Sequence, residues 1–243
     1  MRGPGAGGRE RIPPWLAACL VIAALAAVNV IDDKVPHATL AAAPLCAVVL
    51  PATGRLAGLS RAELGLGRGS LRHGLRWAGA VAGVTAVVVA AGAALPLTRP
   101  AFRDTRYHLH LGSALLTSLV LIPVGTVLLE EVAFRSVLWG LLRRAYGTAA
   151  ATVVSSVAFG FWHALPSLGL ASSDQAITAT VGVGGQARLV TVLATMAFTA
   201  VAGVAFCELR RRSGSLLASA GLHWAVNGLG VLASAAVWAW GTP

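Results

Sequence analysis

The chain has 243 residues, of which 56% are hydrophobic and only 12% charged, and its mean hydropathy is +0.75. Soluble domains carry roughly a quarter charged residues, so this composition excludes a globular surface that faces water. The net charge of +10 does not indicate a nucleic-acid partner, because basic residues of membrane proteins collect in cytoplasmic loops and no solvated segment combines clustered Lys and Arg with interleaved aromatic residues.

Seven apolar runs follow a polar tail, residues 1–14, that we expect to be disordered and cytoplasmic. Most approach the roughly 20 residues that a helix needs to cross the hydrocarbon layer. The runs are Trp15–Ile31, Ala38–Pro51, Trp77–Leu97, Gly112–Leu142, Gly147–His163, Leu189–Cys207 and Ser215–Trp240. The first run ends in polar residues instead of a small-residue cleavage site, so we expect it to be retained. We predict an all-α transmembrane bundle of about seven spans, with a range of six to eight.

The distribution of basic residues predicts the orientation of this bundle. Seven spans place the tail and the segments 52–76, 143–146 and 208–214 on one side, and these hold thirteen basic residues. The opposite loops hold five. The excess predicts an integral membrane protein with a cytoplasmic N-terminus and an outward C-terminus. Segment 164–187 is then an outer loop with room for a short helix.

Ionisable and polar side chains lie inside three of the later spans, where each charge costs roughly 2.5–3.5 kcal/mol on insertion scales. The fourth run contains Glu130, Glu131 and Arg135, the fifth ends in His163, and the last contains His223 and Asn227. Because such residues are rare in spans, they mark a functional site by default.

Helix geometry predicts that these side chains meet. Glu131 and Arg135 are four residues apart, so they share a helix face and can form an ion pair, whereas Glu130 is rotated about 100° away and stays free for another task. His223 and Asn227 share a face in the same way. Counted at about 1.5 Å per residue from the cytoplasmic helix ends, Glu130, His163, His223 and Asn227 all lie roughly 16–24 Å deep.

Hydrolysis of an amide fits this set of residues. A carboxylate in an apolar site can take a proton from water and pass it on, and we assign that role to Glu130. His163 would hold the water, while His223 and Asn227 would donate hydrogen bonds to the oxyanion. A zinc-dependent version is equally open, with Glu131, His163 and His223 as metal ligands and Glu130 still the base.

Three motifs carry a resemblance to a known family. Glu130-Glu131-x-x-x-Arg135, Phe159-x-x-x-His163 and His223-x-x-x-Asn227 resemble the motifs of the CPBP family, which comprises CAAX prenyl endopeptidases and bacteriocin-processing (Abi) membrane proteins. The resemblance covers roughly residues 112–230 and includes the Ser155-Ser156 pair before the second motif. One departure is Ser136, where members often have Gly.

The resemblance implies an intramembrane endopeptidase with a catalytic set of Glu, two His and Asn, and it leaves zinc dependence open. It divides the chain into N-terminal helices and loops, residues 15–111, and a CPBP/Abi-like catalytic core, residues 112–240. The expected partners are membrane lipids and a peptide or membrane-protein substrate.

Two other functions compete with proteolysis. Intramembrane Glu and His also form proton relays, so the chain could be a proton- or ion-coupled transporter. Such transporters usually contain repeats with broken helices in matching halves, whereas here the polar residues all lie in the second half. The third hypothesis is a non-catalytic membrane scaffold of the same fold.

Overall fold

The computed structural model describes residues 12–35 and 38–240, and within these ranges the chain is helical and contains no β-strand. Six helices are long and apolar enough to cross a membrane. This architecture confirms the predicted all-α membrane bundle, while most of the predicted tail, residues 1–11, lies outside the described part. The five separate long helices are α1 Pro14–Lys34, α2 Ala38–Leu56, α3 Leu71–Ala94, α9 Gly185–Ser213 and α10 Leu216–Trp240.

The sixth and longest segment, Leu111–Trp162, is a hairpin that combines two of the predicted runs. It reverses at Gly147, whose φ of 81° is a conformation that glycine adopts without steric penalty. Hydrogen bonds join residues progressively farther from this turn. They link Trp139 to Thr152, the Phe134 carbonyl to Ser155, and Glu130 to Trp162. The prediction of about seven spans is therefore consistent with six long helices.

The first arm of this hairpin alternates between α-helical and π-helical turns. Its elements are α4 Leu111–Leu116, η4 Thr117–Leu121, η5 Pro123–Val127, α5 Leu128–Glu130 and η6 Glu131–Leu138, followed by α6 Trp139–Trp162. Pro123 lacks a backbone N–H and therefore cannot continue an α-helical hydrogen-bond ladder. Short π-helical turns occur frequently at functional sites, and the two adjacent glutamates lie where α5 meets η6.

Several helices are longer than the apolar runs predicted. α3 begins at Leu71 instead of Trp77, and α9 spans Gly185–Ser213 instead of Leu189–Cys207. Apolar residues mark only the part of a helix in hydrocarbon, whereas the backbone ladder continues through arginine-rich ends. The predicted outer loop contains two short helices, α7 Leu170–Ser173 and α8 Gln175–Val181.

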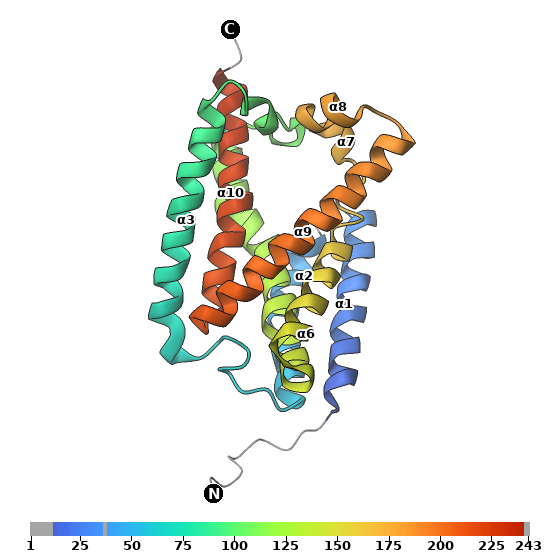
Figure 1. Cartoon of the computed structure of the whole chain (residues 1–243), viewed down its shortest axis with the longest axis vertical. Helices are drawn as coiled ribbons and strands as arrows, with labels where there is room; N and C mark the ends of the chain where they lie inside the picture. The colour runs from blue at the N-terminus through green and yellow to red at the C-terminus, as the bar shows by residue number, and fades with distance from the viewer. Residues whose placement is uncertain (1–11, 36–37, 241–243) are drawn as a thin grey trace, which may run out of the picture.

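The arginine-rich segments gather at one end of the bundle, as their predicted location on one membrane side requires (Figure 1). Arg144, beside the hairpin turn, forms an ion pair with Glu63 at 2.9 Å, and Arg210 at the end of α9 donates to the Glu63 carbonyl. Burial acts to raise the pKa of Glu63, but hydrogen bonds from Ser60 and the Arg144 guanidinium outweigh it and lower that pKa. Which end is cytoplasmic stays a prediction.

The crossing of α9 over the hairpin positions the site. In Figure 1, α9 runs diagonally across the bundle and approaches α10 at its lower end, while α3 lies along the other side of α10. α9 and α6 approach closely at Gly160, where a Cβ atom would lie 2.6 Å from the Met196 carbonyl oxygen. Tight contact at this crossing brings α9 near the end of α6 that carries the second motif.

Candidate active site

The two adjacent glutamates are buried in the middle of the bundle. Glu130 is 4% exposed and Glu131 is 1% exposed. Their side chains point to different partners, as the helical rotation between neighbours predicts. Glu130 Oε1 accepts a hydrogen bond from Trp162 Nε1 at 2.9 Å, whereas Glu131 faces Arg135 and His223.

The predicted ion pair between Glu131 and Arg135 is confirmed. Arg135 Nη1 lies 3.5 Å from Glu131 Oε1, and both side chains are fully buried. The guanidinium also lies 3.7 Å from the ring centre of Phe159 and 4.7 Å from that of Phe206. The Phe134 ring is a third aromatic neighbour, at 5.7 Å. Aromatic faces attract a cation electrostatically, so this charge is compensated by one carboxylate and three rings.

His223 lies between the two carboxylates. Its Nδ1 is 3.0 Å from Glu131 Oε1, and its Nε2 is 3.6 Å from Glu130 Oε2. An ionised carboxylate only accepts hydrogen bonds, so Nδ1 carries the hydrogen and donates to Glu131. The ring stacks on Phe206, with centroids 5.0 Å apart. These contacts fix the imidazole orientation and direct Nε2 towards Glu130.

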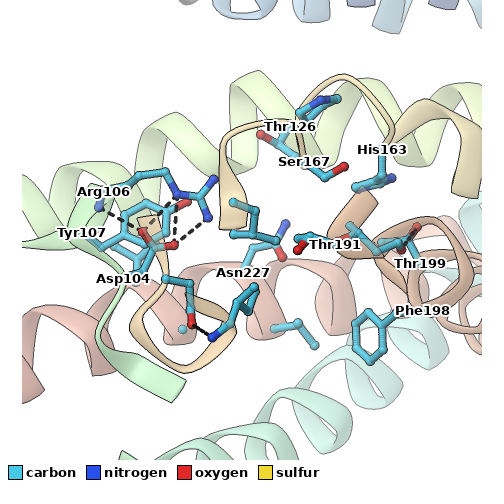
Figure 2. A pocket seen from close by; sticks show the side chains of 18 of the residues that line it. Asp104, Arg106, Tyr107, Thr126, His163, Ser167, Thr191, Phe198, Thr199 and Asn227 are labelled. Carbon is cyan, nitrogen blue, oxygen red and sulfur yellow. Dashed lines mark hydrogen bonds and ion pairs between the residues drawn. The ribbon is translucent and has the colours of Figure 1, made fainter. Parts of the chain in front are cut away.

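Glu130, His163 and Asn227 line a cavity of about 930 Å³. His163 Nδ1 lies 2.8 Å from the Phe159 carbonyl oxygen. Because a carbonyl only accepts, Nδ1 carries the hydrogen, and Nε2 of a neutral ring is then an acceptor. In the view of Figure 2, Asn227 lies between His163 on one side and the Asp104–Arg106 pair on the other.

The predicted site residues therefore form two layers. Glu130, His163 and Asn227 are in contact with the cavity, whereas Glu131, Arg135 and His223 lie behind them and do not line it. The oxyanion role expected for His223 stays a prediction, since both of its ring nitrogens face carboxylates.

The predicted zinc ligands do not form a ready metal site. Among residues 12–35 and 38–240, no three His, Cys, Asp or Glu side chains are grouped so that they could hold a metal ion. Glu131 Oε1 faces Arg135 and His223, so this carboxylate and the His223 Nδ1 are already paired with each other and with a guanidinium. Glu131, His163 and His223 thus do not fit zinc in this arrangement, and zinc dependence stays a prediction.

Several residues around the site were not predicted from the sequence. Trp162 was one, although a buried indole N–H usually needs a partner and that requirement is a usable signal. Asn29 of α1 donates to the Trp162 carbonyl at 2.9 Å. The Asp104–Arg106 ion pair, 2.6 Å long, lines the far part of the cavity and comes from a connection between spans, where no pattern indicated a site.

Part of the chain matches a known protein family. Residues 112–229 match the family described as "Type II CAAX prenyl endopeptidase Rce1-like". No curated protein and no solved structure matches the chain significantly. The matched range contains all six predicted site residues, together with α9 and all of the hairpin except Leu111.

Proposed function

We propose that this multi-pass membrane protein hydrolyses a peptide bond with a water activated by Glu130, because residues 112–229 match the family described as "Type II CAAX prenyl endopeptidase Rce1-like". The observation that supports this most directly is a buried carboxylate that lines a cavity inside the bundle, accepts a hydrogen bond from Trp162 and lies 3.6 Å from His223 Nε2. A carboxylate in this position can remove a proton from water and deliver it to the leaving amine.

The residues that line the cavity supply the other parts of the reaction. His163 has an acceptor nitrogen that can hold the attacking water. Asn227 can donate an amide hydrogen to the oxyanion of the tetrahedral intermediate, and one such donor typically contributes about 10²–10³-fold in rate. The attack forms a bond from water oxygen to the carbonyl carbon, and collapse of the intermediate breaks the C–N bond as the proton reaches nitrogen.

The buried layer positions the base. Glu131 holds His223 by a hydrogen bond at 3.0 Å, and Arg135 balances the charge of Glu131. His223 then presents Nε2 to Glu130 at 3.6 Å. We assign His223, Glu131 and Arg135 as positioning residues, since they act on the substrate through Glu130.

We propose that the substrate is a membrane-associated peptide or a segment of a membrane protein. A cavity with contributions from several membrane helices suits a chain that arrives from the bilayer. The family description names prenylated CAAX substrates, and the resemblance to Abi proteins makes bacteriocin processing a second candidate.

The Glu130→Gln variant tests the function. It keeps the size of the side chain but removes the base, so we expect the bundle to fold and peptide cleavage to be lost. A comparison of membrane proteomes from cells with wild-type or Glu130→Gln protein should show a precursor that accumulates in the variant. The matched control is Glu208→Gln, which changes an exposed glutamate paired with Arg211 and Arg212.

Two outcomes would contradict the proposal. If no precursor accumulates and Glu130→Gln instead abolishes coupled uptake in liposomes, the protein is a transporter. If neither cleavage nor uptake depends on Glu130, the scaffold hypothesis replaces the protease.

A further inference from the structure

The cavity that Glu130 lines is also bounded by exposed apolar residues of α9 and α10. Val190 and Phe198 of α9 and Val226 of α10 line the cavity and are also 45%, 70% and 45% exposed. Apolar residues that belong to both the cavity wall and the outer surface mark an opening towards the bilayer. A substrate segment can therefore reach the cavity sideways from lipid.

Two hydroxyl groups in this part of the cavity have no partner in the described chain. Thr191 of α9 and Ser234 of α10 line the cavity, are 4% and 3% exposed, and neither side-chain oxygen makes a hydrogen bond within residues 12–35 and 38–240. Figure 2 shows Thr191 among the residues that line the cavity together with Asn227. Buried polar groups usually have partners, so these two hydroxyls point to a ligand.

A peptide that is cleaved inside a membrane needs hydrogen-bond partners for its backbone. Its backbone must be extended at the scissile bond, and N–H and C=O groups released from a helix find no water in hydrocarbon. A binding path through the bilayer must therefore supply hydrogen-bond partners. The position of the two hydroxyls, on the helices that flank the lateral opening, meets that need.

We propose that Thr191 and Ser234 form a subsite that binds the extended backbone of a substrate segment entering between α9 and α10. The proposal rests on the protease function argued above. Each hydroxyl can donate to a substrate carbonyl and accept from a substrate N–H. Binding through backbone groups gives affinity without a strict sequence requirement, and the apolar wall receives the side chains.

Thr199 provides a matched control on the same helix. It also lines the cavity, but its hydroxyl is already bonded to the Thr195 carbonyl at 2.8 Å within α9. Removal of the Thr199 hydroxyl therefore takes no hydrogen-bond partner away from the substrate. Thr191→Val and Thr199→Val therefore make the same chemical change at two positions that differ in whether the hydroxyl is available.

The test measures cleavage of the precursor that accumulates with Glu130→Gln, as the ratio of uncleaved to cleaved chain in cells. We expect Thr191→Val and Ser234→Ala each to slow cleavage about five- to tenfold, the effect of one lost buried hydrogen bond. Thr191→Ser, which keeps the hydroxyl, and Thr199→Val should cleave like wild type. With a synthetic peptide spanning the cleavage site, purified Thr191→Val should show a raised KM and an unchanged kcat.

Thermal unfolding in detergent separates binding from folding, and Thr191→Val should melt no lower than Thr199→Val. Equal cleavage by wild type, Thr191→Val and Ser234→Ala would overturn the subsite while leaving the protease function intact. Slow cleavage by Thr191→Ser as well would also overturn it, because shape and not the hydroxyl would then be responsible. Absence of any precursor with Glu130→Gln would instead overturn the protease function, and the subsite with it.

Discussion

Arg135 lies fully buried between the Glu131 carboxylate and the rings of Phe159 and Phe206. A charge that has left water is tolerated only while its partners stay in place. Breaking such a pair by removing one member typically costs about 3–5 kcal/mol, because the remaining charge is uncompensated. The stability of this part of the bundle therefore depends on one guanidinium.

We expect Arg135→Ala to lower the thermal stability of the protein in detergent as well as its activity. The control is Arg212→Ala, which breaks an exposed pair with Glu208 and should cost no more than about 1 kcal/mol. An unchanged melting temperature for Arg135→Ala would show that the ion pair does not stabilise the fold.

Whether the protein binds zinc also depends on a few individual side chains. Because Glu131 is engaged by Arg135 and His223, we expect cleavage to persist after chelation, with little metal in the purified protein by elemental analysis. Activity that is lost on chelation and restored by zinc would instead support Glu131, His163 and His223 as ligands.

At the scale of helices, the crossing of α6 and α9 sets the distance between the two helices beside the site. We expect Gly160→Ala to destabilise the protein by about 1–3 kcal/mol, because the new Cβ would lie 2.6 Å from the Met196 carbonyl oxygen and must displace backbone. Gly79→Ala in α3 is the control, since no atom lies within 4 Å of its Cβ position. Equal melting temperatures would show that the crossing has room to adjust.

The helices also show which features of the fold and the site could be predicted from the sequence. The four-residue spacing of Glu131 and Arg135 is local geometry, so the ion pair was predictable, and so was an all-helical bundle from apolar run length. The two layers of the site depend on how three distant helices rotate against one another, which no local pattern specifies. The same holds for the Trp162 contact with Glu130 and for the unpartnered hydroxyls of Thr191 and Ser234.

At the scale of the whole molecule, the arginine-rich loops and the cavity lie towards opposite ends of the bundle. Arg144 and Arg210 contact Glu63 at one end, while Asp104 and Arg106 line the cavity towards the other. If the arginine-rich end is cytoplasmic, as charge predicts, the cavity opens towards the outer leaflet.

Reporter fusions test this orientation. We expect alkaline phosphatase fused after Pro243 to be active outside the cytoplasm, whereas fusion after Arg212 should be inactive there. The opposite pattern would invert the protein and place the cavity on the cytoplasmic side.

The residues that line the cavity come from a larger part of the chain than the proposed catalytic residues do. The proposed base, its positioning residues and Asn227 all lie within residues 112–229, but Asn29, Asp32, Thr39 and Arg106 line the same space from earlier segments. Selectivity can consequently diverge through changes in the segments before residue 112 while the hydrolytic machinery stays fixed. Paralogues that differ in these early segments would catalyse the same reaction on different substrates.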